Sequence, residues 1–163
     1  MNGREFQEIA KRLEELGRGL HWTVLGLDFA SGRCNVSGKD LPCSLRSFGN
    51  GSKEALVFYI ALLPPPPPSS FTKVKAFMAL VNPLLQQKIC SVLDVDHIPE
   101  AICFKSMLKR EAHPYADGSL QNLIETNIAA GNVLLVLMVS LHLGGIDLEA
   151  AVQNVTSMLR KLR

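Results

Sequence analysis

The chain has 163 residues, of which 47% are apolar and 20% are charged, a balance typical of one folded domain rather than a disordered chain. Its formal net charge of +2 is too small to indicate nucleic-acid binding. The four cysteines form no CxxC pair, and residues 1–16 are charged and amphipathic, unlike a secretory signal peptide. We therefore expect a cytoplasmic protein with free thiols.

The first third of the chain shows one helical pattern followed by extended ones. Residues 4–20 carry apolar side chains at steps of three and four, which predicts an amphipathic helix. Residues 22–48 alternate between apolar and polar positions and predict short strands, with a first turn at residues 31–32. After a turn at residues 49–52, the apolar run at residues 55–63 predicts a buried strand that pairs antiparallel with the preceding one.

Five consecutive prolines, residues 64–68, follow this strand. Proline lacks a backbone N–H and disfavours helix in the residue before it, so the strand must end by Leu63. Ser69 or Ser70 is a candidate N-cap for a helix over residues 71–82. We interpret the proline run as a stiff connector, and the alternative is a polyproline II ligand for an aromatic-lined groove.

The next segments predict a second hairpin. Pro83 should end the preceding helix or restart it with a kink, because proline inside a helix removes a hydrogen bond. Residues 89–94 and 101–108 predict two strands, joined by a turn at residues 96–99.

Two helices are predicted after that hairpin. The first is capped by Asp117 or Ser119 and ends before Gly144, and the second is capped by Asp147. The most apolar window, residues 128–143, is shorter than the ~20 residues that span a membrane. We interpret it as a buried helix and a candidate subunit interface, without stable membrane insertion.

No catalytic, metal-binding or phosphate-binding motif is found. Cys90, His97 and Cys103 flank one predicted hairpin, but zinc sites favour closer pairs such as CxxC or HxxxH. We therefore expect no catalytic residue, no metal and no cofactor. The apolar face of the first helix leaves two interpretations open, namely full burial in the core or a groove for a partner peptide.

Three segments, together with the order of the elements, carry a family resemblance. They are VLGLDFASGRCNVSGKDLPCSLR, with a first hairpin; EALVFYIALLP, a strand that ends in Leu-Pro; and FMALVNPLLQQKICSVLDVDHIPEAICFKSML, a helix followed by the next hairpin. This arrangement resembles the class I type III secretion chaperones of Gram-negative bacteria, the Tir-type effector chaperones. The chain differs from them in its pI near 8.4, its proline run and its last helix.

The resemblance implies a single α+β domain over residues 1–163, with residues 143–163 as an added C-terminal helix. An antiparallel sheet of about five strands would be flanked by helices in the order α-β-β-β-α-β-β-α. It also implies a non-catalytic homodimer in the bacterial cytoplasm. That homodimer would hold the N-terminal chaperone-binding segment of a secreted effector partly unfolded and aid its delivery to the secretion apparatus, whose ATPase is a further candidate partner.

By position, the resemblance also implies two sets of site residues. The effector-binding residues would lie on the first helix and the sheet, at Phe6, Ile9, Leu13, Leu16, Val24, Leu25, Leu27, Leu45 and Phe48. The dimer-interface residues would lie on the central helix and the hairpin after it, at Phe77, Leu84, Leu85, Ile89 and Val92. Two alternatives remain, a non-catalytic α+β adaptor that binds a folded partner and a small enzyme that uses Cys90, His97 or Cys103.

Overall fold

The computed structural model describes residues 1–16, 19–97, 100–110 and 115–162. Six antiparallel strands form one sheet in the order β1-β2-β3-β4-β6-β5. The strands are β1 (His21–Val24), β2 (Phe29–Val36), β3 (Lys39–Phe48), β4 (Ala55–Leu63), β5 (Ser91–His97) and β6 (Glu100–Lys109). The α+β class expected from the sequence is confirmed, with six strands instead of about five.

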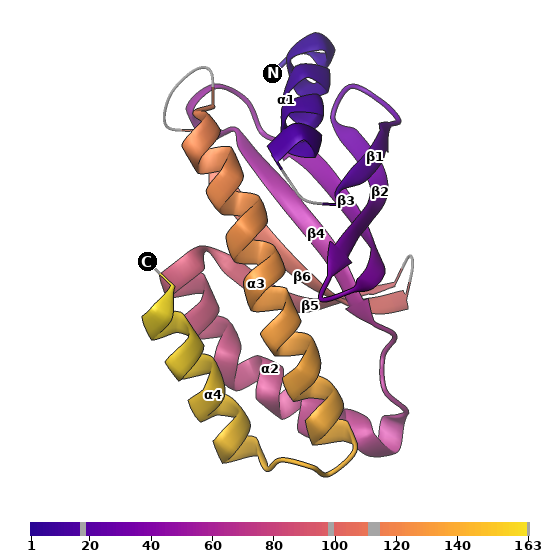
Figure 1. Ribbon diagram of the computed structural model, residues 1–163, viewed down its shortest axis with the longest axis vertical. Helices are drawn as coiled ribbons and strands as arrows, with labels where there is room; N and C mark the ends of the chain where they lie inside the picture. Colours follow the sequence, from indigo (N-terminus) through magenta and orange to yellow (C-terminus); the bar gives the residue numbers. More distant parts are fainter. Residues whose placement is uncertain (17–18, 98–99, 111–114, 163) are drawn as a thin grey trace.

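Four α-helices accompany the sheet. They are α1 (Gly3–Leu16), α2 (Pro68–Ile89), α3 (Asp117–His142) and α4 (Leu148–Lys161). Helix α3 crosses one face of the sheet, where it contacts β2, β4 and β6 (Figure 1). Helix α1 packs near β1, α2 packs near β5, and α4 packs on α2 and α3. The core therefore lies between one face of the sheet and the helices.

The sheet register explains which side chains enter this core. Leu45 lies opposite Phe58, Phe104 lies opposite Ile60 and Leu93, and these residues are almost fully buried. Side chains alternate between the two faces of a strand. The neighbouring positions therefore point to the face that carries no helix, where Arg46 and Met107, for example, are exposed.

The turn predicted at residues 31–32 was wrong. Both residues lie inside β2, and the turn between β1 and β2 comes earlier, at residues 25–28. A Cβ on Gly32 would lie 2.4 Å from the Cα of Trp22 on the neighbouring strand. This glycine is therefore present because two backbones approach closely, not because the chain turns there.

The predicted N-cap of α2 was wrong, and so was one of the two outcomes expected at Pro83, an end of the helix, while the other, a kink, stays a prediction. The helix begins at Pro68, with Pro67 as its N-cap, so neither Ser69 nor Ser70 caps it. It continues through Pro83 to Ile89 as one helix, because Val81 and Leu85 on either side of the proline are fully buried in the core. Their burial offsets the hydrogen bond that Pro83 cannot make.

The predicted end of β4 at Leu63 is confirmed, as is the cap of α4, where Oδ1 of Asp147 accepts a 2.8 Å hydrogen bond from the backbone of Ala150. Helix α3 begins at Asp117 with Ala116 as its N-cap and no side-chain cap, so the predicted caps at Asp117 and Ser119 were wrong. Residues 98–99 of the predicted turn at 96–99 lie outside the described residues.

A buried ion cluster connects the N-terminal helix with the sheet. The carboxylate of Glu54, before β4, has no exposed surface and accepts hydrogen bonds from the Met1 ammonium at 3.0 Å and from Arg110 at 2.7 Å. Arg110, after β6, also bonds Glu5 of α1 at 3.0 Å. Burial opposes ionisation of Glu54, but these hydrogen bonds and the charge of Arg110 lower its pKa. Burial next to Glu54 raises the pKa of Tyr115 to about 12.

We predict that Glu54→Gln destabilises the fold by about 3 kcal/mol at pH 7, because it leaves the buried Met1 ammonium without its anion and Arg110 with Glu5 alone. Since folding lowers the pKa of Glu54, its contribution is present above the ordinary glutamate pKa and is lost as the pH falls through the folded value. The difference in the free energy of unfolding between the variant and the wild type should therefore decrease at acidic pH. Urea unfolding at neutral and acidic pH measures it.

The matched control is Glu8→Gln, which removes only an exposed pair between Glu8 and Arg4 and should leave the free energy of unfolding nearly unchanged. Equal stabilities for Glu54→Gln and the wild type at neutral pH would contradict the role given to the cluster.

Candidate functional site

Large apolar side chains gather at one end of the sheet, some on the helix-free face and one, Leu27, in the turn next to Gly3 of α1. Leu27, in the turn between β1 and β2, is 75% exposed and Phe48, at the end of β3, is 44% exposed. The group, here termed the apolar end, comprises Leu25, Leu27, Phe29, Phe48 and Met107. The register places Phe29 and Met107 at the two ends of one row, which runs through Arg46 and Val57 across β2, β3, β4 and β6.

Arg46 lies at the centre of this surface. Its guanidinium carbon lies 4.8 Å from the ring centroid of Phe29 and 5.8 Å from that of Phe48. A cation over an aromatic face is attracted by the ring quadrupole, and the contact restricts both rings. The apolar end therefore combines preordered aromatic surface with one positive charge.

The free edge of β1 borders the apolar end. The backbone N–H of Trp22 points away from β2 and donates to Oε1 of Glu14 on α1 at 2.8 Å. The N–H of Leu25 points towards β2 and donates to Phe29 at 2.9 Å. Because the direction alternates along a strand, the backbone groups of Val24 point outward, as those of Trp22 do. An extended segment could pair with the edge at Val24.

At the opposite edge, formed by β5, side chains occupy some of the outward backbone groups. The amide of Asn82 on α2 donates to the Leu93 carbonyl at 2.9 Å and accepts from the Leu93 N–H at 2.7 Å, as a neighbouring strand would. The N–H of Val95 donates to Oδ1 of Asp94 at 2.9 Å. Within the described residues, the β5 edge is therefore a poorer site for strand addition than the β1 edge.

The structure separates the nine predicted effector-binding residues into three groups. Four lie in the core and have almost no exposed surface: Phe6, Ile9, Leu13 and Leu45. Two are partly buried, Leu16 and Val24. Three are exposed, Leu25, Leu27 and Phe48. Of the two interpretations of the first helix, burial in the core therefore describes most of its apolar face.

The predicted dimer-interface residues are also divided. Phe77 and Leu85 have no exposed surface in the protomer, whereas Leu84, Ile89 and Val92 are partly exposed. Sequence reasoning missed Phe29, Arg46 and Met107 on the sheet face. Their alternation with buried neighbours was available as a signal, once each strand had been placed in register.

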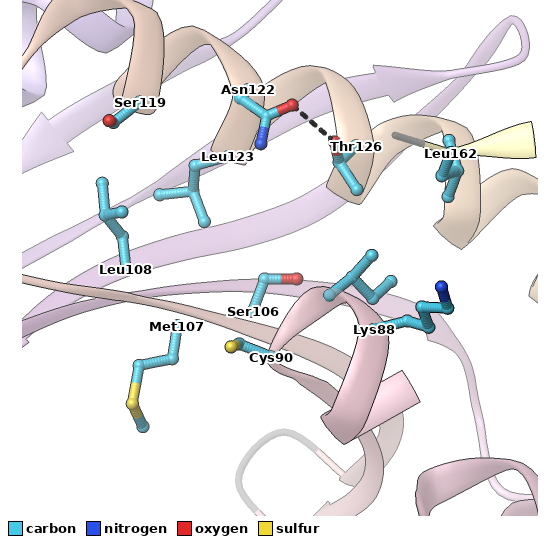
Figure 2. A pocket seen from close by; sticks show the side chains of 11 residues that line it. Lys88, Cys90, Ser106, Met107, Leu108, Ser119, Asn122, Leu123, Thr126 and Leu162 are labelled. Carbon is cyan, nitrogen blue, oxygen red and sulfur yellow. Dashed lines mark hydrogen bonds between the residues drawn. The ribbon is translucent and has the colours of Figure 1, made fainter. Parts of the chain in front are cut away.

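A cavity of about 250 Å³ lies between the end of α2, β6 and α3 (Figure 2). Ser106 points into it, opposite Asn122 and Thr126 of α3, while Met107 points to the other side of β6. Among its lining residues only Lys88 and Cys90 are titratable, so the Ser106 hydroxyl has no histidine or carboxylate beside it as a general base.

A buried chain of hydrogen bonds next to the cavity connects α3 with the sheet. Asn127 donates its side-chain N–H to Oγ of Ser106. The hydroxyls of Ser106 and Ser91 lie 2.7 Å apart, and Ser91 donates to the Ile89 carbonyl at 2.9 Å. Oδ1 of Asn127 is buried and has no hydrogen-bond partner within the described residues. This chain fixes the position of α3 on β6 and β5.

Two residues of the enzyme alternative, Cys90 and Cys103, lie apart. The carbonyl of Cys90 accepts from the N–H of Met107, so Cys103 lies four residues further along β6, about 13 Å away at the rise of a strand. One metal ion cannot bridge that distance. No group of three potential metal ligands occurs in the part of the chain that the structure describes. The side chain of His97 does not belong to that part.

Cys34 and Cys43 form a buried thiol pair on β2 and β3. The hydrogen bond between the two side chains and their burial raise the pKa of Cys43 far above its ordinary value, and the same bond lowers the pKa of Cys34. Both side chains are almost fully buried, so neither thiol is presented to a substrate.

No protein-family model matches the chain, and no curated protein is similar to it in sequence. One helix among the described residues, α3, is long and apolar enough to cross a membrane, but half of its most apolar window is buried in the protomer. The core helices of soluble proteins meet the same criteria.

We predict that Asn82→Ala lowers the free energy of unfolding by about 1–3 kcal/mol, because the edge groups of Leu93 lose both partners. The uncovered β5 edge should also promote concentration-dependent association. Thermal unfolding and light scattering measure the two effects. Asn154→Ala is the control, since it removes one exposed hydrogen bond within α4. A stable Asn82→Ala variant with an unchanged mass would show that this amide does not protect the edge.

Proposed function

We propose that this chain is a non-catalytic chaperone similar to the class I type III secretion chaperones, which holds the N-terminal segment of a secreted effector in an extended state. One observation carries the proposal: the apolar end of the sheet lies beside the free edge of β1, where the backbone groups of Val24 point outward. An antiparallel α+β sheet with helices on one side agrees with the fold that the resemblance implies.

In the proposed mechanism, backbone pairing with the β1 edge supplies affinity, and contacts with the apolar end select the side chains of the bound segment. An effector segment that pairs with the backbone of Val24 must be extended, so binding itself keeps that segment from folding. Alternate side chains of the added strand point to the helix-free face, on the side of Leu25 and Phe48. Burial of apolar surface and main-chain hydrogen bonds then supply the binding free energy, and no cofactor is required.

A homodimer in the bacterial cytoplasm belongs to the same proposal. Two protomers would present two such surfaces to one effector, and the complex would be delivered to the secretion apparatus through its ATPase. The rival proposal is an adaptor for a folded partner, which would use the exposed apolar side chains without strand addition.

We predict that the double variant Leu25→Asp, Leu27→Asp binds an effector N-terminal peptide at least ten-fold more weakly. Burial of one leucine contributes about 1.5–3 kcal/mol, and ~1.4 kcal/mol corresponds to ten-fold in the dissociation constant. Both side chains are exposed, so the fold should be retained. Isothermal titration calorimetry with peptides from candidate effectors gives the affinities, and Leu80→Asp, at an exposed position on α2, is the control.

A second variant separates strand addition from binding of a folded partner. Val24→Pro removes the outward N–H of the β1 edge and should lower the affinity for the effector peptide. The circular dichroism spectrum of the variant should remain that of the wild type. A partner whose affinity falls with Leu25→Asp, Leu27→Asp but not with Val24→Pro supports the adaptor instead. Unchanged affinity in both variants would refute the site.

A further inference from the structure

Helix α3 carries an exposed stripe on the side away from the sheet, and the C-terminal half of this stripe is apolar. Val136 is 56% exposed, Val139 is also exposed, and Leu143, at the end of the helix, is 75% exposed. In Figure 1, α3 lies in front of the sheet and no described element lies over its outer side. The stripe comprises Glu125, Ala129, Asn132, Val136, Val139 and Leu143.

The spacing of the stripe is that of a helix–helix seam. Successive members are four, three, four, three and four residues apart, which is the spacing of the a and d positions of a heptad repeat. A buried helix needs no such narrow seam, because its sequence is apolar on all sides. The stripe is therefore suited to one neighbouring helix.

Two hollows lie end to end along the same stripe. One, of about 580 Å³, is lined by the end of α1, by Asn35 of β2 and by α3 from Ile124 to Ala129. The other, of about 290 Å³, lies between α3 at residues 132–140 and the hairpin that joins β2 to β3, including Lys39. Side chains of an adjacent helix could enter both hollows.

The charges beside the stripe are opposite at its two ends. Glu125 lies at the N-terminal end and Lys39 lies beside the C-terminal half. Neither forms an ion pair within the described residues, although Glu125 accepts a hydrogen bond from Gln121 at 2.9 Å. Two parallel copies of this surface would bring like charges together. Two antiparallel copies would bring Glu125 of each towards Lys39 of the other.

We propose that the stripe binds the same stripe of a second copy, with the two α3 helices antiparallel about a two-fold axis near Asn132 and Val136. The same patch then serves both protomers, as a two-fold interface requires. Asn132 lies near the middle, where one polar residue in an apolar seam specifies register. This location differs from the α2 and β5 surface expected from the sequence, where Phe77 and Leu85 are already fully buried in the protomer.

The inference does not rest on effector binding. The stripe lies on the helical side of the molecule, whereas Phe48 and Met107 lie on the helix-free face of the sheet. Pairing through α3 therefore leaves both apolar ends and both β1 edges accessible.

Sedimentation equilibrium of the full chain tests the interface. The wild type should be a dimer and the double variant Val136→Glu, Val139→Glu a monomer, with an unchanged circular dichroism spectrum because both positions are exposed. Leu80→Glu, at an exposed position on α2, is the control and should stay dimeric. A monomeric wild type, a dimeric Val136→Glu, Val139→Glu variant, or loss of the dimer in Leu80→Glu alone would overturn the inference.

A charge exchange tests the antiparallel arrangement. Glu125→Lys and Lys39→Glu should each weaken the dimer, and the variant with both substitutions should recover it. No recovery would contradict the arrangement.

A monomeric wild type that partitions into phosphatidylcholine vesicles would assign the stripe to a membrane instead. Effector-peptide affinity measured on the Val136→Glu, Val139→Glu variant should equal that of the wild type per protomer, so failure of either proposal can be recognised separately.

Discussion

The whole structure depends on the fact that its helices cover only one face of a six-stranded sheet. The covered face holds the large side chains in register, such as Leu45 against Phe58 and Leu93 against Phe104. The hydrogen bond from Asn127 to Ser106 fixes α3 above them. A polar pair buried in an apolar layer is costly unless it is satisfied, so this bond favours one position of the helix along the strands over any slipped one.

The uncovered face has to remain compatible with water, and long amphipathic side chains make it so. Val57 lies on this face in the row between Arg46 and Met107, yet it is only 6% exposed. Stems of charged residues can cover apolar surface while their charges stay solvated. The exception is the apolar end, where Leu25 and Leu27 project from a turn beyond the last strand pairs. The exposed patch is therefore local, in a face that is otherwise screened.

The elements of the fold were predictable from the sequence because they depend on local periodicity, and the misplaced ones depend on distant neighbours. Asp147 caps a helix through its own backbone contacts, so the sequence signal sufficed. Gly32 was mistaken for a turn because only the adjacent strand reveals why a side chain is forbidden there. The apolar face of α1 presented the same difficulty. Periodicity shows that Phe6 and Leu13 share a face, but only the packed sheet determines that this face is buried.

The contacts at the two sheet edges explain why the exposed patch is a candidate binding surface. Asn82 and Asp94 occupy backbone groups of β5, and Glu14 occupies the outward N–H of Trp22 on β1. Each of these contacts opposes association with another strand, which is a general hazard of open sheets. Val24 is the next outward position after Trp22, and the strand there leads directly into Leu25. Side chains thus occupy edge groups of Trp22, Leu93 and Val95, while Val24 lies beside exposed leucines, and this is the pattern that the proposed binding of one extended segment requires.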